Sequence, residues 1–337
     1  MEINMGEFLN GKRRLALLSA GLALSGVTIL PSWSQAQSAY PTRPIRMVVP
    51  LAAGSAVDVA ARRLAQKMAA NMGQNIVVEN IVGAAGIIGA GQVAKAAPDG
   101  YTIGGFNDSI VTMVPNLNKN MPFDTVRDFA HISQVATIEF SIAVAPNSPF
   151  KSLSDLVAAA KASPGKLTYG SGGIGSPQHM AGALFASHTG IDIKHIPYRG
   201  ASQAAQGAAA GEVDLNFNGI ATVSSLAKAG KLRLIGVMRN TRHPEYPNSP
   251  TLAESGVSGF DYSTWFLLTA PRGTPPEIVN RLHAEVLKAL ADEELQQRFA
   301  ALGLRPDGTT PAQVSELVRT QLNRYKKAVE DNNIKPE

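Results

Sequence analysis

Three glycines in the stretch YGSGGIGSPQHMAGALF have the spacing G-x-G-x-x-G that many dinucleotide-binding proteins use. They are Gly170, Gly172 and Gly175, and they lie between an apolar segment and an expected helix. A dinucleotide site also needs an acidic residue about 20 positions further on, at the far end of the second strand, to hold the ribose. Asp192 has the right spacing but begins its strand, and the far end, residues 198–200, carries no carboxylate. The sequence therefore does not favour a nucleotide site.

The same turn suits a smaller anion. A glycine-rich turn that opens a helix presents free backbone N–H groups, and the helix dipole adds about half a positive charge there. Ser171 and Ser176 add hydroxyl groups, and His179 on the first helical turn either donates to a ligand or caps the helix locally. A second turn of this kind, PLAAGSAVD at residues 50–58, joins the first expected strand to the first expected helix. Either turn could also be only a tight connection between a strand and a helix.

Other sequence patterns argue against catalysis, metal binding and nucleic-acid binding. The chain has no G-x-S-x-G nucleophile elbow, and no H-E-x-x-H or comparable spacing for a metal ion. Cysteine is absent, which excludes disulfides and cysteine-ligated metals. Apart from a basic cluster at the N-terminus, the sequence has no lysine and arginine cluster of the kind that a nucleic-acid groove needs. We therefore predict no catalytic residue, no cofactor, no metal ion and no nucleic acid. A secreted hydrolase or transferase, assembled only in three dimensions, stays the alternative from another class.

The first 36 residues have the composition of a secretory signal peptide. A basic KRR triplet precedes the apolar run LALLSAGLALSGVTIL, and small residues follow up to Ala36. The apolar run is short for a membrane span of about 20 residues, so an uncleaved anchor is the less favoured alternative. We predict cleavage after Ala36 and a soluble, monomeric, periplasmic protein, exported by the general or the twin-arginine route.

Short β-rich runs alternate with helical patterns along the rest of the chain, which predicts an α/β fold with parallel-rich sheets flanked by helices. The expected strands are residues 45–50, 75–80, 101–105, 166–170, 191–198, 213–217 and 232–237. The expected helices are residues 57–73 and 152–165, three that start near residues 175, 201 and 222, and two long ones at 275–303 and 311–332. Gly73 is expected to end the first helix, and Ser152 and Asp155 to form a capping box.

Two extended segments, residues 140–152 and 259–275, look like crossings between two lobes. If they are paired hinge strands, residues 37–143 plus 262–337 form one lobe and residues 144–261 form the other, after the signal peptide of residues 1–36. The hinges then lie near Phe140 and Tyr262, and the two glycine-rich turns face each other across a cleft.

These stretches, taken together and in order, resemble the Bug-type periplasmic solute-binding proteins, the receptors of tripartite tricarboxylate transporters. The resemblance covers the chain from Tyr40 to the C-terminus. It rests on the motifs YPTRPIRMVVPLAAGSAVDVAARRLAQKM, VVENIVGAAGIIGA, APDGYTI, MPFDTVRDF, GSGGIGSPQHMAGALF, HIPYRG and GEVDLNF. It implies a two-lobed type II periplasmic binding protein fold with the ligand cleft between the lobes. It also implies a non-enzymatic receptor that delivers a small organic carboxylate to integral-membrane transporter subunits. A receptor that signals to a sensor kinase stays an alternative.

The resemblance also implies that main-chain groups and hydroxyls of the two glycine-rich turns hold the carboxylate. The candidate ligand-binding residues are Ala53, Gly54, Ser55, Asp58, Asn107, Ser109, Ser171, Gly172, Gly175, Ser176, His179, Tyr198 and Asn218. Within this set, Asp58 is expected to brace its loop, because an unpaired carboxylate would repel an anion. Asn218 stands where amino-acid-binding members tend to carry Asp, which weakens an amino-acid ligand without deciding among di- or tricarboxylates and aromatic acids. Asp108, between two candidates, either enters the cleft or is solvated.

Overall fold

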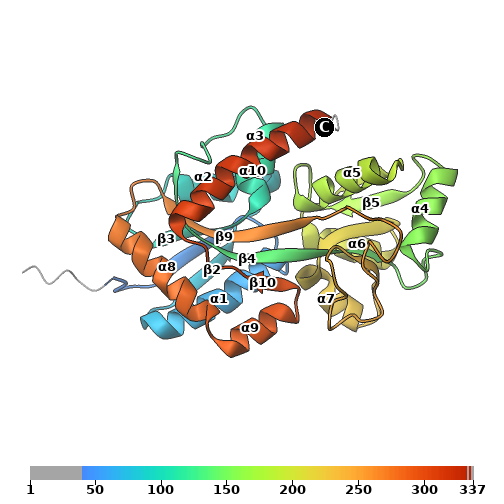
Figure 1. Cartoon of the computed structure of the whole chain (residues 1–337). Coiled ribbons are helices and arrows are strands. Elements are labelled where there is room, and N and C mark those ends of the chain that lie inside the picture. The colour runs from blue at the N-terminus through green and yellow to red at the C-terminus, as the bar shows by residue number, and fades with distance from the viewer. Residues whose placement is uncertain (1–39, 332–333, 335–337) are drawn as a thin grey trace, which may run out of the picture. The chain divides into compact units, whose positions relative to one another are not determined.

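The computed structural model describes residues 40–331 and Ile334 (Figure 1), so the predicted signal peptide lies outside the described residues. The strands are β1 Ile45–Val49, β2 Ile76–Asn80, β3 Thr102–Asn107, β4 Phe129–Val144, β5 Thr168–Ser171, β6 Lys194–Pro197, β7 Leu215–Gly219, β8 Arg233–Val237, β9 Ser263–Pro271 and β10 Leu304–Pro306. The helices are α1 Ala56–Met72, α2 Ile87–Ala94, α3 Val114–Leu117, α4 Leu153–Ala162, α5 Pro177–Thr189, α6 Ala201–Ala210, α7 Ile220–Lys228, α8 Pro276–Leu290, α9 Glu293–Ala300 and α10 Pro311–Asp331. A 3-10 turn, η1 Ala84–Gly86, precedes α2, and a π-helical turn, η2 Ser109–Met113, precedes α3.

The strands form two sheet regions that share the long strand β4. The first has the order β2-β1-β3-β9-β4, and the second has the order β4-β7-β5-β6, with β10 and β8 also paired to β4. Strands β1, β2 and β3 pair in parallel, as do β5, β6 and β7. The predicted parallel-rich sheets are confirmed, but β4 and β9 run antiparallel to their neighbours. The reason is that the chain leaves the first region through β4 and returns through β9.

The two predicted crossing segments do pair with each other. β4 and β9 lie side by side from the Phe129–Pro271 pair to the Glu139–Ser263 pair (Figure 1). β4 begins eleven residues earlier than expected. The sequence did not predict its first half because this half is rich in polar residues, such as His131 and Ser133, which are nevertheless buried. A strand covered on both faces shows no polar–apolar alternation to predict it.

The predicted helix caps at Gly73 and at Ser152 with Asp155 are confirmed. Gly73 ends α1 in the left-handed conformation, with φ 68°. Ser152 and Asp155 form both hydrogen bonds of a capping box at the start of α4. The single helix predicted for residues 275–303 is wrong, because the chain breaks between α8 and α9. There Asp292 becomes a new N-cap and accepts a hydrogen bond from the backbone N–H of Leu295.

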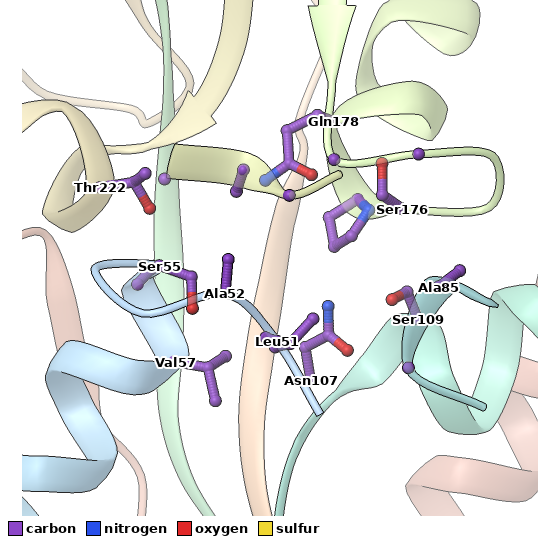
Figure 2. Close-up of a pocket in the computed structure, with 18 of the residues that line it drawn as sticks. Leu51, Ala52, Ser55, Val57, Ala85, Asn107, Ser109, Ser176, Gln178 and Thr222 are labelled. Atoms are coloured by element: carbon purple, nitrogen blue, oxygen red, sulfur yellow. The ribbon is translucent and has the colours of Figure 1, made fainter. Parts of the chain in front are cut away.

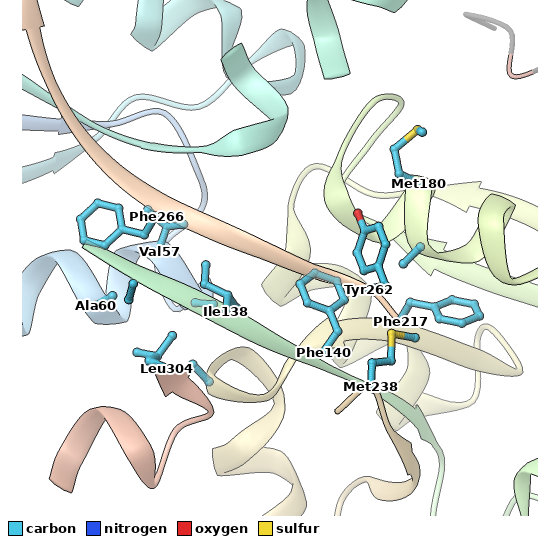
Figure 3. Close-up of a cluster of buried hydrophobic side chains, with 14 of the residues drawn as sticks. Val57, Ala60, Ile138, Phe140, Met180, Phe217, Met238, Tyr262, Phe266 and Leu304 are labelled. Atoms are coloured by element: carbon cyan, nitrogen blue, oxygen red, sulfur yellow. The ribbon is translucent and has the colours of Figure 1, made fainter. Parts of the chain in front are cut away.

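An apolar core follows β4 from one sheet region into the other. Figure 3 shows Phe266 and Ile138 at one end, and Phe140, Tyr262 and Phe217 further along. The rings of Phe140 and Tyr262 pack edge to face, with their centroids 5.2 Å apart. From Tyr40 onward the chain packs as one compact unit, so the predicted lobe boundaries stay a prediction. Every helix in the described part of the chain is too short or too polar to cross a lipid bilayer.

Candidate ligand-binding site

A cavity of about 280 Å³ lies at the carboxyl ends of the parallel strands, between the two sheet regions (Figure 2). Its lining comes from the segments that end or follow β1, β2, β3, β5, β6 and β7, together with side chains of β4 and β9. In open α/β sheets, ligands bind at this edge because the strands end there and helices begin. The polar lining residues are Ser55, Asn107, Ser109, Ser176, Gln178, Tyr198, Arg199, Asn218, Thr222 and Thr264.

Five helices start at the cavity wall. The N-cap residues of α1, α2, α5, α6 and α7 all line it, and they are Ser55, Gly86, Ser176, Gly200 and Gly219. A helix N-terminus offers unpaired N–H groups and about half a positive charge. Among the described residues of the lining, the one charged side chain is the exposed Arg199, and no carboxylate is present. The cavity therefore favours an anion.

Two buried polar atoms of the lining have no hydrogen-bond partner among the described residues. Asn107 and Thr222 are almost fully buried, at 4% and 7% exposed, yet their side-chain oxygens make no hydrogen bond within the described part of the chain. A buried polar atom without a partner costs about 1–3 kcal/mol, so such atoms in a cavity wall indicate a bound ligand or water. Figure 2 shows both side chains at the cavity, on opposite sides of it.

The first predicted turn forms part of the cavity wall, and the side chain of Asp58 holds it in place through hydrogen bonds. Ser55 lines the cavity, and its hydroxyl oxygen accepts a hydrogen bond from the backbone N–H of Asp58 at 3.3 Å. The buried carboxylate of Asp58 accepts hydrogen bonds from the Gly54 N–H, from Arg62 and from Asn80 at 2.9–3.0 Å. Asp58 thus braces its loop, as expected.

Two residues of that first turn do not line the cavity. Ala53 and Gly54 are exposed at the outer rim, and the Ala53 carbonyl oxygen accepts a hydrogen bond from Ser202 at 2.8 Å. Leu51 and Ala52 line the cavity in their place (Figure 2). The turn reverses direction at Gly54, with φ 76°, and this directs its tip away from the cavity.

The second predicted turn contributes Gly172 and Ser176 to the lining. The Ser176 hydroxyl oxygen accepts a hydrogen bond from the backbone N–H of His179 at 3.3 Å, and it makes no other hydrogen bond with a described residue. A hydroxyl that accepts at a helix start keeps its own proton available for a ligand oxygen. Ser176 and Ser55 present this same arrangement on opposite walls (Figure 2).

Ser171, Gly175 and His179 support the second turn from outside the cavity. The buried Ser171 hydroxyl lies 2.6 Å from His195 Nε2, and the Gly175 N–H donates to His179 Nδ1 at 3.1 Å. The imidazole of His179 stacks on that of His195, with centroids 4.2 Å apart. Burial lowers the pKa of His195 to about 4, so this ring is neutral at pH 7. His179 therefore acts as a local cap in this structure.

The prediction for Asp108 is wrong in both of its alternatives. Asp108 is fully buried and does not line this cavity, and neither carboxyl oxygen has a hydrogen-bond partner within the described part of the chain. The backbone N–H groups of Ser109 and Trp265 lie near it but outside hydrogen-bond geometry. Burial raises the pKa of Asp108 well above its usual value. The chain turns into the π-helical η2 directly after β3, which leaves Asn107 and Ser109 at the cavity and sends Asp108 into the core.

The remaining candidates, Tyr198 and Asn218, both line the cavity. The Tyr198 hydroxyl donates to Glu212 at 3.0 Å, so only the ring serves the cavity. Asn218 is fully buried and holds its neighbours in place through four hydrogen bonds of its side chain.

The loop at residues 82–86 forms a wall of the cavity, and none of its residues was among the predicted ligand-binding residues. Gly83, Ala84, Ala85 and Gly86 have φ values of 138°, 46°, 52° and 97°, so four consecutive residues have positive φ. An alanine in the left-handed region costs about 1–2 kcal/mol, and such strain concentrates at functional sites. The signal was present in the motif VVENIVGAAGIIGA, whose glycines mark the turn before α2.

Two sheet regions joined by paired crossing strands, with an anion-favouring cavity at the strand ends, are the architecture of periplasmic binding proteins. Comparison with known proteins gives the family. Residues 60–334 match the family model described as the tripartite tricarboxylate transporter family receptor. The chain belongs to this family, as the sequence motifs predicted.

Curated relatives match over nearly the whole chain. The "UPF0065 protein in tcbD-tcbE intergenic region" of Pseudomonas sp. (strain P51) is 36% identical over 320 residues, which cover 95% of this chain and 94% of the relative. "Protein BugT" of Bordetella pertussis is 32% identical, over 97% of this chain and 99% of the relative.

Solved structures of similar proteins have the same fold. "R. palustris Rpa4515 with adipate" is 32% identical with a TM-score of 0.85, and the match covers 88% of this chain and 100% of that one. "MatC (Rpa3494) from Rhodopseudomonas palustris with bound malate" is 29% identical with a TM-score of 0.80, over 86% of this chain and 100% of that one. This chain therefore has the predicted two-lobed type II periplasmic binding protein fold.

Proposed function

We propose that this protein is a non-enzymatic periplasmic receptor that closes on a small organic carboxylate and delivers it to integral-membrane transporter subunits. The observation that carries the proposal is the cavity where five helices start and where no described lining side chain is anionic. A volume of about 280 Å³ lies just below the usual range for ligand pockets, about 300–1,000 Å³, which suits a small acid.

The carboxylate ligands and the transport role enter by similarity to relatives. Two similar structures are named with bound adipate and malate, and the family is a family of transporter receptors. We propose that residues 1–36 direct export and are removed, and that the mature chain is monomeric. We also propose that residues 37–143 plus 262–337 and residues 144–261 move as two lobes about β4 and β9.

A thermal-shift screen tests the binding function. The panel contains di- and tricarboxylates, aromatic acids and amino acids, and diols and diamines of matching length serve as controls. A ligand that binds only the folded state at 100 times its Kd stabilises it by about 2.7 kcal/mol. We expect at least one acid to raise the melting temperature, with no shift from its diol or diamine. If no acid does so, the proposed function is wrong.

A contact between the two sheet regions, at the rim of the cavity, supports the closing motion. The Ser202 hydroxyl in the first turn of α6 donates to the Ala53 carbonyl of the first glycine-rich turn at 2.8 Å. Nearby, a Cβ added at Gly200 would lie 2.6 Å from the Cβ of Ala52. The first glycine-rich turn and the start of α6 therefore meet at a distance that only glycine at position 200 permits.

We expect Gly200→Ala to lower ligand affinity about tenfold while the protein still folds. The backbone of Gly200 is extended, with φ −179°, so alanine is not strained there. The added Cβ would also lie 2.8 Å from Gln203 Oε1, but this end of a flexible side chain can move, whereas Ala52 cannot move without shifting its turn. Overpacking of this kind costs about 1–3 kcal/mol in the closed state. Calorimetric titration measures the effect with the best acid from the panel. Gly91→Ala is the control, because its added Cβ would lie at an ordinary 3.7 Å from Pro122. Unchanged affinity in Gly200→Ala would contradict closure at this contact.

A further inference from the structure

Three side-chain amides form a chain that leads into the cavity. Asn216 Nδ2 donates to the Gly170 carbonyl at 2.9 Å, so its Oδ1 is the atom that accepts from Asn218 Nδ2 at 3.0 Å. Asn218 Nδ2 also donates to the Ala201 carbonyl at 3.0 Å. A carbonyl oxygen can only accept, so these two backbone contacts fix which way both amides point.

The same logic fixes the amide of Gln178. Asn218 Oδ1 accepts from the backbone N–H of Gly219 at 3.0 Å, which confirms that this atom is the oxygen. It also accepts from Gln178 Nε2 at 3.1 Å. The nitrogen of Gln178 is therefore held by Asn218, and its Oε1 is the free end of the chain.

The free Oε1 of Gln178 belongs to the cavity wall. Gln178 lines the cavity at the start of α5, is 6% exposed, and points toward the cavity interior in Figure 2. Its one hydrogen bond with the described residues is the one it donates to Asn218. This oxygen is open to the cavity, so a ligand that fills the cavity without offering a donor leaves it unpaired, at a cost of about 1–3 kcal/mol.

We propose that Gln178 Oε1 accepts a hydrogen bond from a hydroxyl group of the ligand, so that the preferred ligand is a hydroxy acid. This inference rests on the proposed function, because it specifies which carboxylate the same cavity selects. The helix starts and the two serine hydroxyls supply donors for carboxylate oxygens, whereas Gln178 supplies a fixed acceptor that would repel them. An ammonium group would also donate, but the described lining offers no carboxylate to balance its charge.

Matched pairs of acids test this inference in the wild-type protein. The pairs are succinate with malate, glutarate with 2-hydroxyglutarate, and benzoate with 4-hydroxybenzoate, and aspartate and glutamate are the amino analogues. We expect the hydroxylated member of at least one pair to bind about tenfold to a hundredfold more tightly, since an acceptor left unpaired disfavours the deoxy acid. Calorimetric titration gives each Kd, and this comparison requires no variant.

A variant assigns the preference to Gln178. Gln178→Met keeps the length of the side chain and removes the acceptor, so we expect it to bind both members of the pair within about threefold. Gln203→Met is the control, because Gln203 is exposed on α6 and does not line the cavity. If the wild type binds each deoxy acid or amino acid as tightly as the hydroxy acid, or if Gln178→Met keeps the preference, the inference is overturned. If the deoxy acids bind but the preference is absent, only the inference about hydroxy acids is wrong and the proposed function still holds. If no acid binds at all, both the inference and the proposed function are wrong.

Discussion

Replacing Ser176 by aspartate is expected to lower carboxylate affinity by a factor of a hundred or more without unfolding the protein. The Ser176 side chain lines the cavity and caps α5, so a carboxylate there would face the ligand's own carboxylate. Two like charges about 4 Å apart repel by about 4 kcal/mol at an effective dielectric constant of 20, and each 1.4 kcal/mol is a factor of ten. Aspartate is itself a good N-cap, so the helix start should be retained.

The measurement is calorimetric titration of both proteins with the acid that stabilises the wild type most, together with circular dichroism and melting temperature. Thr310→Asp is the matched control. Thr310 caps α10 through a 3.3 Å hydrogen bond from the Gln313 N–H, is exposed, and does not line the cavity. The control should bind as the wild type does. Unchanged affinity in Ser176→Asp would show that this turn only connects β5 to α5.

The second large effect is expected from Asp108→Asn, and it concerns stability rather than binding. Burial raises the pKa of Asp108 well above 3.8, so the native state holds a proton that the unfolded chain releases. Its contribution to stability is fully present below pH 3.8 and is lost as pH rises through the native pKa. Between these limits one such group lowers the free energy of unfolding by up to about 1.4 kcal/mol per pH unit. Asparagine removes this dependence.

We therefore expect the difference in unfolding free energy, variant minus wild type, to grow from pH 4 to pH 8 in denaturant titrations. The histidines with pKa values lowered by burial, such as His131 and His195, are present in both proteins and cancel in the difference. Asp192→Asn is the control, because it removes one carboxylate at an exposed position. A pH-independent difference for Asp108→Asn would mean that Asp108 is not in the buried environment described above.

The features that could be predicted from sequence are those that depend on neighbours along the chain. Gly73 at the end of α1, and Ser152 with Asp155 at the start of α4, occupy the predicted capping positions because a cap satisfies backbone groups within four residues. Ser55 and Ser176 were predicted as ligand-binding hydroxyls in two turns that open helices, and both line the cavity.

The features that sequence missed depend on contacts between distant segments. Gln178 directly follows the cavity residues Ser176 and Pro177. The orientation of its amide, however, is fixed by Asn218, which Asn216 holds in turn, and both lie about 40 residues away. Asp108 was expected either in the cleft or in solvent, but the π-helical turn after β3 sends it into the core, where an aspartate is rarely found without a partner. Burial of the first half of β4 likewise comes from helices that follow much later in the chain, namely α8 and α10.

The most direct test of the account is a crystal structure of the protein with its best carboxylate at a concentration well above the Kd. The account predicts the ligand inside the cavity of Figure 2, with a carboxylate oxygen within hydrogen-bond distance of the Ser176 hydroxyl or a free N–H at the start of α5. A second polar contact should come from the opposite wall, at Ser55 or the start of α1 or α2. A ligand bound outside this cavity, or one whose carboxylate lies away from all five helix starts, would contradict it.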